Sequence, residues 1–136
     1  MKFLSAVARI SLVYDLTVGV VMLAATGLLA SVFGVAPPTP ILFAKLLGIF
    51  LICVGLGYAP AIKNPGIHRW YLWVFGVGLK TAGAVSFIAD YVMNASPRAF
   101  LLFAASDGTL ALLTLWGLFG LSKEMTRLSG QSSDRR

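Results

Sequence analysis

Four long apolar runs constrain this chain more than any other feature of its sequence. They cover residues 10–33, 41–62, 70–93 and 99–121. Each is longer than the ~20 residues that a helix needs to cross the hydrocarbon core of a bilayer. Lipid offers the backbone no hydrogen-bond partners, so spanning segments of this kind must be helical. The sequence therefore predicts an all-α polytopic membrane protein in which four transmembrane helices form a compact bundle.

The composition agrees with a lipid environment. Hydrophobic residues make up 58% of the chain and charged residues only 12%, whereas a soluble domain carries about 25% charged residues. The mean hydropathy is +0.87. We expect one transmembrane domain over residues 1–121. The remaining residues 122–136, SKEMTRLSGQSSDRR, are expected to form a flexible polar tail in the cytoplasm.

Lysine and arginine gather on one side of the expected bundle. The segments GVAPPTP (34–40) and NASPR (94–98) contain a single basic residue, Arg98. The N-terminal flank, the segment KNPGIHR (63–69) and the tail hold eight more: Lys2, Arg9, Lys63, Arg69, Lys123, Arg127, Arg135 and Arg136. Basic loops stay in the cytoplasm, so both termini are predicted to be cytoplasmic. A cleaved signal peptide is disfavoured, because the first run is too long and Asp15 interrupts it.

The net charge of +6 has a simple interpretation in this arrangement. The cations flank the apolar runs, where they meet the anionic headgroups of the bilayer. No helix-turn-helix or RNA-binding pattern accompanies them. We therefore expect the lipid bilayer, and not nucleic acid, as the partner of this charge.

Ionisable residues also lie inside the apolar runs. Asp15, Lys45, Lys80 and Asp107 are within the spans, and Asp90 is near the outer end of the third. A charge at the centre of a membrane helix costs about 2.5–3.5 kcal/mol. Each of the four spans places its charge on a helical face with small residues, the type used for close helix packing in membranes. These faces, and the charges with them, are expected to point into the bundle.

The depth of each charge follows from its distance along the helix. Lys80 lies near the middle of the membrane, Asp107 and Lys45 lie progressively toward the outer side, and Asp15 lies toward the inner side. We therefore predict a buried Lys45–Asp107–Lys80 network. Asp15 would reach Lys80 from the inner side or associate with Tyr14 and Thr17.

Two interpretations of this network remain open. The first is a structural ion pair that fixes the register of the helices. The second is a polar site for a proton, an ion or an anionic ligand, because ionisable residues inside a membrane commonly mark functional sites. A partner protein could also supply a counter-charge.

The sequence shows none of the common catalytic or metal-binding motifs. HExxH, GxSxG, CxxC and phosphate-binding glycine loops are absent from it. Cys53 lies in an apolar run and is expected to pack in the interior, and His68 lies in a basic loop. We therefore expect no catalytic residue, no metal and no cofactor.

Parts of the second half are similar to a known group. The segments GLGYAPAIKNPGIHRW (55–70) and GVGLKTAG (76–83), with Asp107–Gly108, resemble small four-helix bacterial membrane proteins that are loosely DoxX-like. The first span departs from that pattern, because Thr26–Gly27–Leu28 lacks an expected lysine. The resemblance implies the four-helix layout and directs attention to Lys80 and Asp107. It implies no activity.

These observations favour a non-catalytic accessory or structural subunit of a larger membrane assembly. The alternative is a small carrier or channel, built from several copies of the chain, that uses the buried Lys/Asp network. A lipid- or quinone-linked redox helper is a weaker third hypothesis, since Cys53 and the aromatic residues are its only support.

Overall fold

The computed structural model describes the backbone of residues 1–133 and the side chains of residues 1–123, and every regular element in this part is helical. The elements are α1 (Lys2–Ala24), α2 (Thr26–Val32), α3 (Leu42–Lys63), α4 (Arg69–Tyr71), η1 (Leu72–Leu79), α5 (Lys80–Asn94), η2 (Arg98–Phe100) and α6 (Leu101–Ser133). Among the described residues, 4 helical segments are long and apolar enough to cross a membrane. The all-α prediction is therefore confirmed for the described residues, as is the presence of four helices long and apolar enough to span a membrane.

The first span has different bounds from those predicted. α1 begins at Lys2 and not at residue 10, because Leu4, Val7 and Ala8 already lie on its buried face. The chain leaves helical geometry at Ala25, where φ is −138° and ψ is 40°, and resumes as the short helix α2. The apolar run 10–33 is thus one long helix followed by a second, short one.

The last helix is longer than predicted. α6 continues to Ser133, so residues 122–133 of the expected flexible tail are helical. This segment contains no proline and several good helix formers, which allow the helix to continue past the apolar run. The expected tail residues 134–136 lie outside the described part of the chain.

The third span is one continuous helical rod with a π-helical segment. α4, η1 and α5 follow one another without a break, and η1 is the π-helical part. Leu72, Gly76, Lys80 and Ala84 are buried at intervals of four residues. The wider turn of a π-helix, closed by i→i+5 bonds, keeps residues at this spacing closer to one face than an α-helix would. η1 therefore helps to aim Lys80 and Gly76 in the same direction.

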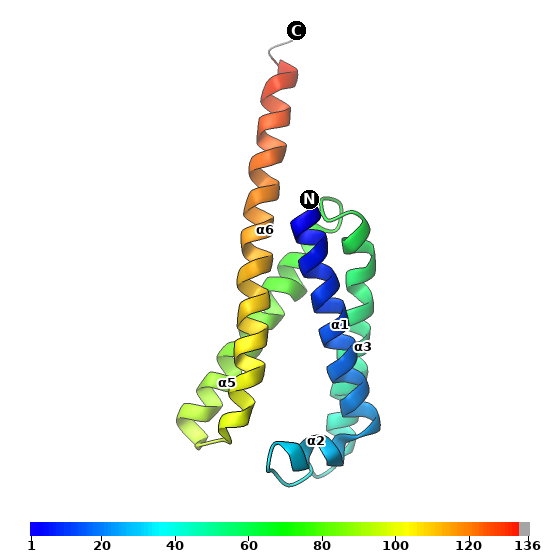
Figure 1. The fold of residues 1–136 in the computed structure, drawn as a ribbon, viewed down its shortest axis with the longest axis vertical. Helices are drawn as coiled ribbons and strands as arrows, with labels where there is room; N and C mark the ends of the chain where they lie inside the picture. The colour runs from blue at the N-terminus through cyan, green and yellow to red at the C-terminus, as the bar shows by residue number, and fades with distance from the viewer. Residues whose placement is uncertain (134–136) are drawn as a thin grey trace.

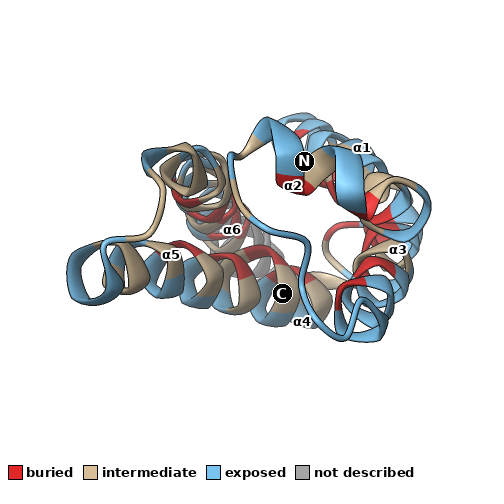
Figure 2. Cartoon of the chain, turned by 90° about the horizontal axis from the view of Figure 1, so that it is seen from below, coloured by how far each residue is buried: buried red, intermediate tan, exposed pale blue. Residues whose placement is uncertain are grey.

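The four spans pair into two helical hairpins. α1 packs against α3, and α5 packs against α6. Figure 1 shows the hairpins meeting near the N-terminus and the α3–α4 connection, and diverging towards the end that carries α2. The predicted compact bundle is thus tight at one end only. Figure 2 shows that the buried residues lie on the faces that turn towards neighbouring helices.

The tight end of the molecule is also its basic end. α1 begins at Lys2, α3 ends at Lys63 and α4 begins at Arg69, so these residues share one end of the bundle. We call it the basic end, and the end that carries α2 the opposite end. A core cluster of buried residues fills the basic end: Leu4, Ala8, Val54, Tyr58, Ala61, Leu72, Leu118 and Leu121.

Aromatic rings connect the two hairpins at the opposite end. The ring of Phe33, which follows α2, lies 5.4 Å from that of Phe100 and 5.2 Å from that of Phe103. The ring of Phe87 on α5 lies 5.4 Å from that of Phe103. This cluster gives the diverging hairpins a second point of contact.

Glycines hold α1 and α3 close together. A Cβ atom at Gly19 would lie 2.7 Å from the carbonyl oxygen of Gly48, and one at Gly48 would lie 2.8 Å from the carbonyl oxygen of Gly19. Both obstacles are backbone atoms, which cannot move without separating the helices. Small residues allow this close approach, and the helices then gain van der Waals contact along their whole length.

Gly48→Ala should therefore destabilise the protein. We expect a loss of about 1–3 kcal/mol in the free energy of unfolding, as for other overpacked interfaces. The measurement is unfolding by SDS in mixed micelles, followed by circular dichroism. The matched control is Gly120→Ala in α6, where a Cβ atom would meet nothing within 4 Å. Equal stability of Gly48→Ala and the parent would contradict the close glycine contact.

Candidate functional site

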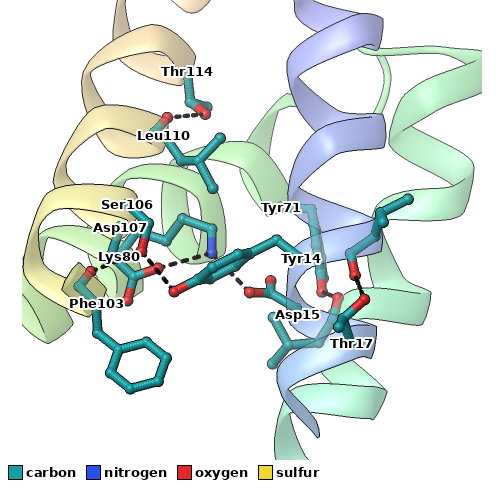
Figure 3. A network of polar contacts seen from close by, with 12 residues as sticks. Tyr14, Asp15, Thr17, Tyr71, Lys80, Phe103, Ser106, Asp107, Leu110 and Thr114 are labelled. Carbon is teal, nitrogen blue, oxygen red and sulfur yellow. Dashed lines mark hydrogen bonds and ion pairs between the residues drawn. The ribbon is translucent and has the colours of Figure 1, made fainter. Parts of the chain in front are cut away.

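A buried lysine joins three helices at the centre of the molecule. Lys80, the first residue of α5, places its Nζ 2.8 Å from Oδ1 of Asp15 on α1 and 3.3 Å from Oδ1 of Asp107 on α6. The Lys80 side chain is 4% exposed. Figure 3 shows the two carboxylates approaching the ammonium group from different helices. We call Asp15, Lys80 and Asp107 the triad.

The triad links the two hairpins. Asp15 belongs to the α1–α3 pair, while Lys80 and Asp107 belong to the α5–α6 pair. The Lys80–Asp15 bond thus crosses from one hairpin to the other, and the Lys80–Asp107 bond stays within one. Gly83 leaves room for the second bond, because a Cβ atom there would lie 3.1 Å from Oδ2 of Asp107.

Tyr14 adds a second link across the same gap. Its hydroxyl oxygen lies 2.7 Å from the hydroxyl oxygen of Ser106 on α6. Its ring also lies beside the lysine, with Lys80 Nζ 4.8 Å from the ring centroid. A cation near an aromatic face is stabilised by about 2 kcal/mol or more when it is desolvated. Tyr14 therefore supports the Lys80 ammonium as well as the contact between α1 and α6.

The triad contains one more acid than base. With all three groups ionised, two carboxylates face one ammonium, which leaves a net charge of −1. The second carboxylate is not equally buried, since the Asp15 side chain is 3% exposed and that of Asp107 is 18% exposed. The Asp107 bond is also the longer of the two. Asp107 is thus the more weakly held and more accessible acid.

Unpaired polar atoms extend the site towards the basic end. Within the described part of the chain, three buried side-chain oxygens make no hydrogen bond of normal length: Ser11 Oγ, Asp15 Oδ2 and Tyr58 Oη, although the Ser11 and Tyr58 hydroxyls lie near enough to interact with each other. Ser11 lies one helical turn from Asp15 on the same face of α1, nearer the basic end. A buried polar group without a partner costs about 1–3 kcal/mol. Such a cost is commonly offset by an ordered water molecule.

Lys45 does not belong to the site, so the predicted Lys45–Asp107–Lys80 network is wrong in its Lys45 part, whereas its Lys80–Asp107 pair is present. Lys45 is exposed and makes no ion pair with any described residue. The buried positions of α3 near it are Ala44 and Gly48, which places Lys45 beside the packed face. It lies close to the start of α3, where a long side chain can extend to the headgroups.

Asp90 is also separate from the triad. Its carboxylate accepts hydrogen bonds from the Asn94 side-chain amide at 2.6 Å and from the Ser96 hydroxyl. These residues surround the end of α5, where Ala95 adopts the left-handed conformation. Asp90 therefore stabilises this helix end and the turn that follows.

Other expectations have mixed outcomes. Asp15 does reach Lys80, which the sequence left as one of two possibilities, and Thr17 instead donates to the Val13 carbonyl. Cys53 is exposed on α3, so its expected packing role is wrong. Ser106 was missed, although its place next to Asp107 in the sequence is a usable signal. No group of three His, Cys, Asp or Glu residues that could hold a metal occurs among the described residues.

Lys80→Met should be strongly destabilising. It leaves the Asp15 carboxylate buried without its cation, for which about 3–5 kcal/mol is typical. Unfolding by SDS in mixed micelles gives the loss, and the double variant Lys80→Met/Asp15→Asn should recover part of it.

The matched control for this substitution is Lys45→Met, which should change the free energy of unfolding by less than about 0.5 kcal/mol because no described residue pairs with it. A double-mutant cycle should also give a larger coupling for Lys80–Asp15 than for Lys80–Asp107. Equal losses for Lys80→Met and Lys45→Met would contradict the triad.

The comparisons with known proteins add no relative. No protein-family model, no curated protein and no solved structure matches the chain. The resemblance to DoxX-like membrane proteins therefore stays a prediction from the segments quoted above, and the site is interpreted from its own geometry.

Proposed function

We propose that this protein is a small multi-pass membrane protein whose triad binds and releases a proton, and that it works as a carrier or channel. One observation carries the proposal: a single buried ammonium, Lys80, is shared by carboxylates from α1 and α6. This shared ammonium explains how the triad can bind a proton and how it links the two hairpins, and the liposome experiment below tests it.

A purely structural ion pair does not explain the second carboxylate. One acid is enough to neutralise one lysine, and each further charge in a membrane interior adds a cost of about 2.5–3.5 kcal/mol. A proton on either acid brings the triad to net neutrality. Two acids that share one base therefore form a group whose net charge stays between −1 and 0 as it gains and loses a proton.

The position of the triad connects protonation to the shape of the protein. A proton on Asp15 removes the ion pair between the hairpins. A proton on Asp107 instead leaves Lys80 paired with Asp15 alone, which strengthens the Lys80–Asp15 ion pair. The hairpins already diverge at the opposite end (Figure 1). A local change of charge is commonly converted into a larger change of structure when one packed pair of helices moves relative to another.

The local structure around Lys80 also supports a functional role. η1, a π-helical segment, ends at the residue before Lys80. π-Helical turns are rare and frequently occur at functional sites. The buried hydroxyls of Ser11 and Tyr58 offer hydrogen-bonding groups between the triad and the basic end. Water molecules held there would give a proton a route to Asp15.

The membrane and its orientation belong to the same proposal. The basic end gathers Lys2, Lys63 and Arg69, and positive residues favour the cytoplasmic side. On this basis both termini are cytoplasmic, and Asp107 is the acid nearer the outer side. The bacterial inner membrane follows from the resemblance to bacterial proteins of this size and layout.

A second function is favoured by a different observation. The face of α3 that turns away from α1 exposes large apolar residues around Lys45, among them Phe43 at 68% and Leu46 at 50%. A helix of another membrane protein could cover this face and pair its own carboxylate with Lys45. In that case the chain would be an accessory subunit, and the triad would fix its register.

Proton movement through liposomes tests the main proposal. We expect purified protein in liposomes to collapse an imposed pH gradient, read by an internal pH-sensitive dye, faster than liposomes without protein. Asp107→Asn should reduce this rate to near that of empty liposomes, while circular dichroism shows that the helices remain. Lys45→Met is the matched control and should behave as the parent. A rate for Asp107→Asn equal to that of the parent would contradict the proposal.

The mass of the native complex separates the two functions. A carrier or channel should elute from mild detergent as one or several copies of this chain. An accessory subunit should instead elute with other chains at a fixed ratio, and that result would favour the second function over the first.

A further inference from the structure

A basic pocket lies at the surface of the basic end, between the start of α1 and the end of α3. Its volume is about 330 Å³, and Lys2, Ser5, Arg9, Lys63 and Asn64 are among the residues that line it. Figure 1 shows the beginning of α1 beside the α3–α4 connection at this end. The pocket shares no residue with the triad.

The side chains of Lys2, Arg9 and Lys63 give the pocket a positive charge. Lys2, Arg9 and Lys63 are exposed, and none of them forms an ion pair with a described residue. Among the residues whose side chains are described, no aspartate or glutamate lines the pocket. Three cations that surround one concave site repel one another, so the site gains stability when an anion enters it.

Hydrogen-bond donors accompany these charges. The Ser5 hydroxyl and the Asn64 amide line the same pocket. α1 begins here, and no side chain caps its first turn. The backbone N–H groups of an uncapped first turn carry partial positive charge and favour a phosphate. A phosphate would thus find both charge and directed donors in one place.

Apolar surface leads away from the pocket on both helices. On α1, the face of Arg9 continues through Val13 and Val20, which are 57% and 52% exposed. On α3, the face of Lys63 continues through Leu56 and Ile49, which are 57% and 46% exposed. Acyl chains can lie along these faces while a headgroup occupies the pocket. A soluble phosphate compound has no acyl chains and would make no contact with these apolar faces.

We propose that this pocket binds the phosphate headgroup of an anionic membrane lipid, with Lys2, Arg9 and Lys63 around the phosphate oxygens. Arginine and lysine are the usual ligands of phosphate in proteins, and basic pockets between membrane helices bind anionic headgroups. Three cations favour a headgroup with two negative charges over a single phosphodiester. The pocket therefore prefers a lipid with two phosphate groups, such as cardiolipin, to phosphatidylglycerol.

Native mass spectrometry of the full chain in detergent tests the proposal. The protein is titrated with cardiolipin, phosphatidylglycerol and phosphatidylcholine, and the bound fraction is measured for each lipid. We expect the affinities to fall in that order. Arg9→Gln/Lys63→Gln should weaken cardiolipin binding by about tenfold or more, since each basic residue near an anionic surface contributes about one factor of five.

The matched control removes the same charge from the same end. Arg69 and Lys123 do not line the pocket, so the double variant Arg69→Gln/Lys123→Gln should weaken cardiolipin binding by less than about threefold. An equal loss in both double variants would show a diffuse attraction to the basic end and would overturn the site. Asp107→Asn should bind cardiolipin as the parent does, which keeps this result independent of the proton-binding proposal.

A competition experiment separates lipid from free phosphate. Inorganic phosphate in excess should leave cardiolipin bound, because phosphate alone gains nothing from the apolar faces of α1 and α3. Displacement of cardiolipin by inorganic phosphate at similar concentrations would overturn the lipid assignment and leave a site for soluble phosphate.

Discussion

The burial of Lys80 is the constraint on which the rest of this structure depends. An ammonium group in an apolar interior is tolerated only when opposite charge and hydrogen bonds surround it. Asp15 and Asp107 meet this need from two different helices, and the Tyr14 ring adds a third favourable contact. Three helices must therefore hold a fixed register relative to one another. An error of one residue in any of them would leave a charge unpaired.

The packing around the triad makes this register possible. Gly19 and Gly48 bring the backbones of α1 and α3 into contact, which fixes the position of Asp15. On the other side, Gly76 leaves space for Thr114, because a Cβ atom there would lie 2.8 Å from the Thr114 methyl carbon. The apolar core at the basic end then holds the two hairpins together. The charged link thus sits where tight packing gives way to the diverging opposite end (Figure 1).

Much of the fold, and part of the site, follows from sequence patterns. Apolar length predicts four spanning helices, and the spacing of small residues predicts that Asp15, Lys80 and Asp107 point inward. The same spacing also predicts that Lys45 points inward, which is wrong. One residue along a helix turns the side chain by about a third of a circle, and the packed face that contains Gly48 and Gly55 does not extend to Lys45. Ala44, not Lys45, occupies the packed face of α3. The π-helical segment η1, which packs against α6, has no local sequence signal. The early start of α1 was missed because its first turns are amphipathic, not wholly apolar.

The central claim is that the triad holds an exchangeable proton inside the membrane. Infrared difference spectroscopy of the protein in lipid, recorded between acidic and alkaline buffer, measures this directly, since protonated and ionised carboxyl groups absorb at different frequencies. The account predicts a protonated carboxyl band that titrates reversibly while the helices remain intact. That band should disappear in Asp107→Asn or Asp15→Asn and persist in Asp90→Asn. A triad whose carboxylates both stay ionised throughout the titration would contradict it.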